Sequence, residues 1–235
     1  SKRHGATSVI EYERLGYLPE AMVNFLALLG WSPGEDREVL TRDELTTLFG
    51  LEAISGGNAV FNVEKLDWFN QQHIARLGAA ELLARIRPRV EDAGLWRASL
   101  EASEAEWVAR VLDLLKPLVR KLDHLVEELR PFLVDEPEFE PSAATKHLTP
   151  EIRPVLTRLA AAVESLETFD AAALEHAVRG TAEAAAVKAP ALIHATRVAV
   201  TGRAVSAGLF EVLALLGRDR VTRRLLRAVT YTLAT

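Results

Sequence analysis

Apolar residues recur every three or four positions along most of this chain, which is the spacing of an amphipathic α-helix. The first clear helix is predicted to begin at Pro19, because proline fits the first helical turn, and to end at Gly30. Thr41, with Glu44 three residues later, predicts a capping box for a helix through about residue 49. Asn62 is a typical N-cap for the next helix.

From about residue 79 the pattern is almost wholly helical. A stripe of apolar residues between positions 107 and 125 predicts one helix, with a kink at Pro117. Residues 134–142 hold two prolines and four acids, so they are the best linker candidate. Further helices are predicted at about 149–168, 170–187, 190–201 and 208–230.

Evidence for strands is confined to the first 65 residues, where residues 7–10 and 59–61 are short candidates. The pattern alone therefore predicts a mostly α-helical protein with one internal boundary near residues 135–145.

Composition narrows the class of protein. Hydrophobic residues make up 49% of the 235 positions, which is enough for a buried core, and cysteine is absent. Disulfides, zinc–thiolate sites and cysteine nucleophiles are thereby excluded, and a cytoplasmic protein is expected. There is no signal peptide and no apolar run near 18 residues, so we expect no membrane partner. The opening residues read like the middle of a loop, and the first is not methionine, which suggests a fragment.

Charge is unevenly distributed. Between positions 197 and 227, seven arginines face only Glu211 and Asp219, a local charge of +5, while the rest of the chain sums to −10 for a net charge of −5. This basic end can be a solvated arginine face or a nucleic-acid contact. Duplex DNA is not the expected partner, because the body is acidic and no helix-turn-helix signature is present.

Motifs for independent chemistry are lacking. The six histidines have no metal-ligand spacing, so no metal site is predicted. Neither a phosphate-binding glycine loop nor a nucleophile elbow occurs, and neighbouring acids such as Glu127 and Glu128 are typical of a solvated surface.

Four stretches resemble the bacterial glutamyl-tRNA synthetase family, in the family's order. Residues 1–6, Ser-Lys-Arg-His-Gly-Ala, resemble the end of the KMSKS-type loop of class I synthetases. Residues 16–33 are similar to the segment that follows this loop, and residues 61–70 and 197–217 follow the family pattern further along. The resemblance implies a C-terminal portion of such an enzyme, expected to be monomeric.

The resemblance also implies a domain plan and a fold class. A small α(+β) region that contacts the tRNA stem is expected at residues 1–78, followed by two all-α helical-bundle anticodon-binding subdomains at 79–133 and 149–235, with a linker at 134–148. The parent enzyme would use ATP, with Mg²⁺, to join glutamate to the glutamate tRNA. The fragment alone is expected to be inactive, because most of the catalytic domain is not in it. The alternative from another class is a helical protein-binding adaptor with no RNA role.

Site residues follow from the family by position. Ser1, Lys2 and Arg3 match the loop that binds ATP, where a lysine stabilises the charge on the phosphates. Anticodon contacts are expected from two arginines and a turn, because unpaired bases stack on guanidinium planes and are read by backbone groups. These residues are Arg179, Arg197, Ser206, Gly208 and Leu209. For Arg179 the alternative is a cation at a helix C-terminus, before Gly180.

Leu118 departs from the family pattern. Discriminating members carry an arginine at this position, where it reads the last anticodon base, and leucine cannot hydrogen-bond a base. Arg120 lies two residues later, so on a helix it would point elsewhere. The hypothesis is relaxed reading of the third base, which would let the enzyme charge the glutamine tRNA as well.

Overall fold

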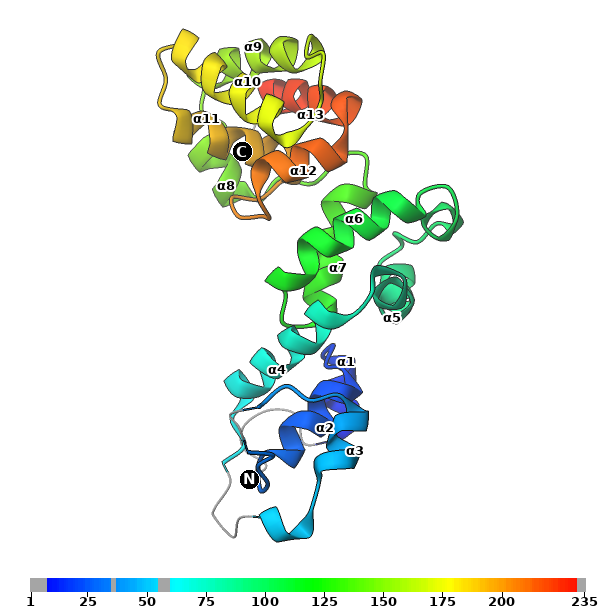
Figure 1. Ribbon diagram of the computed structural model, residues 1–235. Helices are drawn as coiled ribbons and strands as arrows, with labels where there is room; N and C mark the ends of the chain where they lie inside the picture. Colours follow the sequence, from blue (N-terminus) through cyan, green and yellow to red (C-terminus); the bar gives the residue numbers. More distant parts are fainter. Residues whose placement is uncertain (1–7, 35–36, 55–59, 232–235) are drawn as a thin grey trace. The chain divides into compact units, whose positions relative to one another are not determined.

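The computed structural model describes residues 8–34, 37–54 and 60–231, and these residues are predominantly helical (Figure 1). The chain divides into two compact units, unit 1 at residues 1–127 and unit 2 at residues 128–235. The predicted mostly α fold is confirmed. No helix in the described ranges is long and apolar enough to cross a lipid bilayer.

Within its described residues, unit 1 contains six α-helices and the start of a seventh, with three short 3₁₀ helices between them. They are α1 (Val9–Arg14), α2 (Pro19–Ala27), α3 (Arg42–Leu48), η1 (Leu51–Ala53), α4 (Val63–Arg76), α5 (Ala79–Asp92), η2 (Ala98–Glu101), α6 (Ala105–Leu115), η3 (Lys116–Leu118) and α7 (Leu122–Leu133), which continues into unit 2.

The strand expected at residues 7–10 is wrong from residue 8 onward. Ser8 accepts a hydrogen bond from the Glu11 backbone N–H at 3.3 Å, and the Glu11 carboxylate accepts one from the Ser8 N–H at 3.1 Å. This capping box begins α1 instead. Among the described residues the only β feature is an isolated bridge between Trp31 and Ile54. The strand expected at residues 59–61 is therefore also wrong for the described residues 60 and 61.

One core cluster of unit 1 forms where α2 packs against α4, through Met22, Phe25, Leu66 and Phe69. Burial of these apolar side chains stabilises the contact between the two helices. The predicted caps of α3 and α4 are confirmed, since Thr41 and Glu44 form a capping box and Asn62 accepts two backbone N–H bonds.

A buried amide explains why the predicted helix across Pro117 is interrupted. Asn70 is fully buried; its Nδ2 donates to the carbonyl of Arg120 at 2.6 Å and to that of Gly16 at 3.2 Å. The Arg120 carbonyl is therefore turned toward α4 instead of along a helix. Pro117 also lacks the N–H that a continuous helix needs. The result is a break from η3 to the start of α7 in place of a kink.

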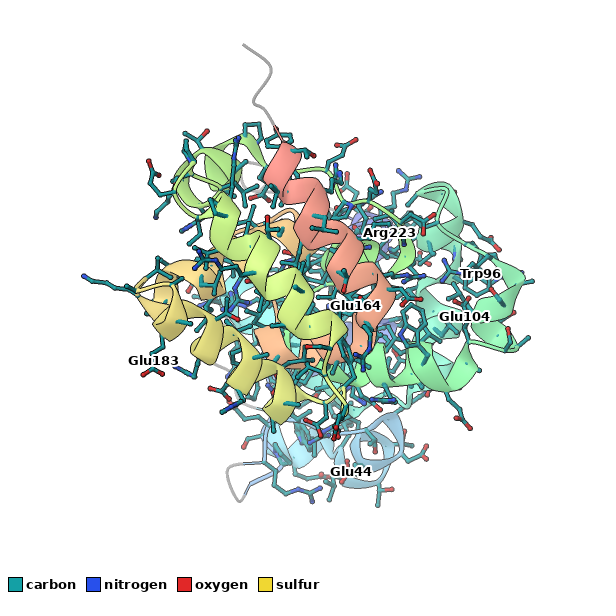
Figure 2. All side chains as sticks on the ribbon, turned by 90° about the horizontal axis from the view of Figure 1, so that it is seen from above. Glu44, Trp96, Glu104, Glu164, Glu183 and Arg223 are labelled. Atoms are coloured by element: carbon teal, nitrogen blue, oxygen red, sulfur yellow. The ribbon has the colours of Figure 1, made fainter. Side chains whose placement is uncertain are left out.

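Up to residue 231, where its description ends, unit 2 is built from the rest of α7 and six further helices. They are α8 (Pro141–His147), α9 (Arg153–Glu164), α10 (Ala171–Ala184), α11 (Ala189–Thr201), α12 (Leu209–Leu216) and α13 (Arg218–Thr230). Figure 2 shows α9 and α13 side by side, with Glu164 at their junction, and Thr222 of α13 donates to the Glu164 carboxylate at 3.0 Å.

The single helix expected at 208–230 is two helices. Gly217 separates α12 from α13 with φ +81° and ψ 159°, a conformation open essentially to glycine alone. The chain therefore changes direction at Gly217, although the apolar periodicity continues across it and predicted a single helix.

Residues 134–148, expected as a linker, are closely attached to the rest of unit 2. The Glu140 backbone N–H donates to the carbonyl of Gly202 at 2.8 Å, and residues 141–147 form α8. Gly202 has φ +80°, and a Cβ there would lie 2.0 Å from the carbonyl oxygen of Glu138. The close approach of these two backbone segments requires glycine. The predicted subdomain boundaries at 79, 134 and 149 stay predictions.

Candidate functional site

Arg197 lies on α11 and holds the segment that follows this helix. Its Nη1 atom donates to the Ser206 hydroxyl at 2.6 Å, to the Ala207 carbonyl at 2.9 Å and to the Ser206 carbonyl at 3.4 Å. The side chain is half-buried, and burial lowers the pKa of the guanidinium below its ordinary value, although arginine stays charged. The guanidinium plane is thus fixed against the turn formed by residues 206–209, here called the 206–209 turn.

The 206–209 turn leads directly into α12. Gly208 is exposed and precedes the first helical residue, and no side chain caps the helix. The first N–H groups of α12 therefore have no partner within the helix. Leu209 is only 3% exposed as a whole residue, so the surface that this end of the turn offers to a ligand comes from Gly208.

The absence of a side chain is what Gly208 contributes. Its φ is −48°, so no left-handed conformation demands glycine here. A Cβ would lie 2.3 Å from the Glu211 carboxylate oxygen, which is the mobile end of a long side chain. The turn consequently presents bare backbone at its exposed position, as a reader of base edges requires.

Arg179 lies on the neighbouring helix α10, which packs against both α11 and α12. Its Nε atom pairs with the Glu175 carboxylate one turn earlier, at 2.7 Å, and the side chain is 55% exposed. The helix continues past Gly180 to Ala184, so the alternative of a C-terminal helix cation is wrong. The structure thus brings together four of the five predicted residues, and it leaves Arg179 on an adjacent helix face.

Leu118 lies in unit 1, at the end of η3, and is 52% exposed. Leu118 and Arg120 do not share a helix, so the expectation that Arg120 points elsewhere on the same helix does not apply. Arg120 lies in the break before α7, where its carbonyl accepts the bond from Asn70. Ser1, Lys2 and Arg3 lie outside the described residues.

The arginine-rich end is not a solvated face. Arg224 is fully buried and donates to four backbone carbonyls, those of Pro131 at 2.8 Å, Val134 at 2.6 Å, Asp135 at 3.0 Å and Val200 at 2.6 Å. Burial, and next the nearby arginines of α13, lower its pKa to about 10, so it stays charged at neutral pH.

Other arginines of α13 also donate hydrogen bonds to backbone carbonyls. Arg220 donates to the Phe132 carbonyl at 2.7 Å, Arg218 to the Glu164 carbonyl at 2.5 Å, and Arg227 to the Pro137 carbonyl at 2.6 Å. Carbonyls at the ends of α7 and α9 lack partners within their helices, and arginine forks satisfy them. Many of the local positive charges are therefore bound to backbone carbonyls inside unit 2. These bonds were not predictable from the sequence, since the partners are far away along the chain.

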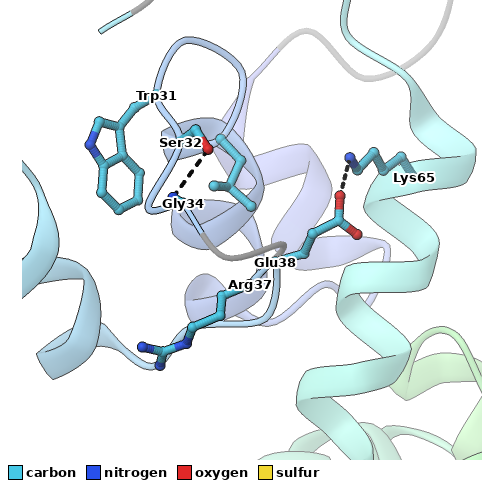
Figure 3. Close-up of a pocket in the computed structure, with 7 residues that line it drawn as sticks. Trp31, Ser32, Gly34, Arg37, Glu38 and Lys65 are labelled. Carbon is cyan, nitrogen blue, oxygen red and sulfur yellow. Dashed lines mark hydrogen bonds and ion pairs between the residues drawn. The ribbon is translucent and has the colours of Figure 1, made fainter. Parts of the chain in front are cut away.

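A pocket in unit 1 shows no comparable chemistry (Figure 3). Its charged side chains are paired, Glu38 with Lys65 at 2.7 Å and Arg37 with Glu44 at 2.6 Å. The described part of the chain holds no group of three or more His, Cys, Asp or Glu side chains that could bind a metal ion. The pocket is lined by Leu28, Trp31, Ser32, Gly34, Arg37, Glu38 and Lys65.

Comparison with known families decides the class of the chain. The family model described as "Anticodon binding domain" matches residues 79–229, well over half of the sequence. The chain belongs to this family. A second model, described as the catalytic domain of class I tRNA synthetases (E and Q), matches residues 1–68.

Individual relatives agree with this anticodon-binding family assignment. The chain is 40% identical over 231 residues to glutamate–tRNA ligase 1 of Syntrophus aciditrophicus, and 41% identical over 230 residues to glutamate–tRNA ligase 2 of Koribacter versatilis. These matches cover 98% and 97% of the chain, but 48% and 47% of the relatives, so the chain spans about half their length. The predicted resemblance to glutamyl-tRNA synthetases is confirmed.

A solved structure shares the fold of this anticodon-binding chain. The crystal structure of a glutamate tRNA ligase from Elizabethkingia meningosepticum, in complex with its amino acid, superposes with a TM-score of 0.80 at 24% identity. It matches 97% of this chain and 44% of the solved one. At this identity the likeness concerns the fold.

Proposed function

We propose that this chain is the tRNA-recognition part of a glutamate–tRNA ligase, in which Arg197 and the 206–209 turn read anticodon bases. The observation that carries the proposal is the three-bond contact from Arg197 to Ser206 and Ala207. It holds a planar cation beside exposed backbone at Gly208, and unpaired bases bind to that combination. Arg179, exposed on α10, supplies a second contact once it exchanges Glu175 for RNA.

The relatives and the anticodon-binding family favour tRNA recognition over the protein-adaptor alternative. In the proposed parent enzyme, ATP with Mg²⁺ activates the carboxylate of glutamate, which is then transferred to the glutamate tRNA. We assign the ATP phosphates to Ser1, Lys2 and Arg3 by family position alone. The purified chain is expected to charge no tRNA, and glutamylation by this chain alone would refute that expectation.

The test of the site is Arg197→Ala in the whole chain. Loss of the guanidinium removes both a stacking surface and the anchor of the turn, so affinity for the glutamate tRNA should fall by about 1–3 kcal/mol, and discrimination against an anticodon-swapped tRNA should shrink. Arg223→Ala is the matched control, because Arg223 is exposed and makes only a 3.9 Å pair with exposed Asp135. Equal effects of the two substitutions would contradict the assignment.

A further inference from the structure

Two histidines from different helices stack in unit 2. The ring of His147, at the end of α8, lies 5.0 Å from that of His194 on α11, with an angle of 20° between the ring planes. Helices α8 and α11 pack side by side in this unit (Figure 1). His147 is half-buried, whereas His194 is exposed. The pair is therefore a flat aromatic surface with one ring open to the surroundings.

The stack lies one helical turn from the proposed RNA site. His194 precedes Arg197 by three residues on α11, and positions three apart share a helix face. The residues between them, Ala195 and Thr196, are buried, which leaves His194 and Arg197 on the accessible side of this turn. The imidazole of His194 and the guanidinium that holds the 206–209 turn therefore come from the same face of α11.

Burial and nearby charge keep the ring of His147 neutral, which suits it to stacking. Burial first, and then the neighbouring His194 and Lys146, hold the pKa of His147 below its ordinary value of 6.5. At neutral pH this ring is uncharged, so two positive rings do not repel each other. Lys146 and Arg197 flank the pair with positive charge, which favours a polyanion.

We propose that the His147–His194 stack is a platform for an unpaired base of the anticodon loop, extending the site of Arg197 and the 206–209 turn. This inference rests on the proposed function. Bases stack on aromatic side chains, histidine included, in single-stranded RNA recognition. The ring of His194 makes the contact with the base, and His147 behind it fixes the orientation of that ring.

The test uses the whole chain and an anticodon stem-loop RNA, intact or with one loop base removed at each position in turn. His194→Ala should weaken binding of the intact loop by roughly 5- to 160-fold, the range of one base–aromatic stack. The loss should vanish for the one RNA that lacks the stacked base. His194→Phe, which retains an aromatic ring, should restore most of the affinity. Arg223→Ala, exposed on α13, is the control substitution.

Each outcome separates the stack from the underlying site. If Arg197→Ala weakens binding and His194→Ala does not, the platform is overturned while the anticodon site stands. The platform is also overturned if His194→Ala weakens binding equally for every base-deleted RNA. It is overturned too if His194→Phe binds as weakly as His194→Ala. Either result would mean that His194 has a merely structural role. If Arg197→Ala changes nothing, the proposed function itself fails.

Discussion

Arg224 donates a hydrogen bond from Nη1 to the carbonyl oxygen of Val200, at 2.6 Å, inside the core of unit 2. Val200 is near the end of α11, three residues after Arg197, so this bond ties the helix of the proposed RNA site to α13. The other three bonds of Arg224 reach Pro131, Val134 and Asp135. One buried cation thus joins three segments of the chain.

Arg224→Lys should be strongly destabilising. Lysine retains the charge, but its single ammonium cannot reach four carbonyls in a planar fork. Buried acceptors would lose their partners, and the free energy of unfolding should fall by about 3 kcal/mol. Denaturant unfolding of the whole chain measures this. Exposed Arg223, one position earlier, is the control, and its alanine variant should change stability little. A lysine variant as stable as the parent would contradict the role given to Arg224.

Gly202→Ala should also destabilise unit 2. Alanine in a left-handed backbone conformation costs about 1–2 kcal/mol of stability. Moving the Glu138 backbone away from the new Cβ costs about 1–3 kcal/mol more. Gly94 supplies the comparison, because it too has positive φ, +69°, but a Cβ there would meet no atom within 4 Å. Gly94→Ala should therefore show only the first cost. Similar losses for the two variants in thermal or urea unfolding would mean that the backbone contact at Gly202 is not tight.

Acid should weaken unit 1 through His73. This side chain is buried, and its Nε2 lies 3.0 Å from Asn24 Oδ1, an acceptor, so the neutral ring donates there. Burial first, and then Arg76, lower its pKa from the ordinary 6.5. The unfolded chain consequently binds more protons below pH 6.5, and the free energy of unfolding falls as pH drops through that value. His73→Gln, which cannot titrate, should flatten this slope between pH 7 and 5; an unchanged slope would refute the assignment.

Leu118→Arg should sharpen the choice of tRNA. Leucine offers no hydrogen bond to a base, whereas arginine at this exposed position can read one. We expect the ratio of affinities for the glutamate and glutamine tRNAs to rise in the arginine variant, with Leu118→Ala, the control, at the parental ratio. The proposal that third-base reading is relaxed fails if the parent and the arginine variant discriminate equally.

Features that depend on neighbouring residues were predictable from the sequence. The caps at Thr41 and Asn62 depend on bonds that span two or three residues. Arg197 and the 206–209 turn were identified by family position alone, and the bonds between them, which span nine or ten residues, are seen only in the structure. The roles of Asn70 and Arg224 were not predictable. Arg224 meets Pro131 across 93 positions, and Asn70 meets Arg120 across 50, so only the folded chain shows what these polar side chains bond.

The break at Gly217 was missed for a different reason. Its flanking residues continue an apolar helical period, and a single glycine inside such a period is often tolerated. The φ of +81° decides the matter, and this is a property of the backbone that residue type permits but does not dictate. The arginines of α13 misled in a similar way, because their spacing is that of a charged face while several of them point inward to carbonyls.

Anticodon reading is tested by measuring how the purified chain binds the glutamate tRNA, and the same tRNA with a swapped anticodon, across a salt series. We expect affinity that falls with salt, with a log–log slope of about 0.7 to 0.9 per phosphate contact, and a clear preference for the cognate anticodon at every salt concentration. Equal affinity for the two tRNAs, or no binding at low salt, would contradict anticodon reading by this chain.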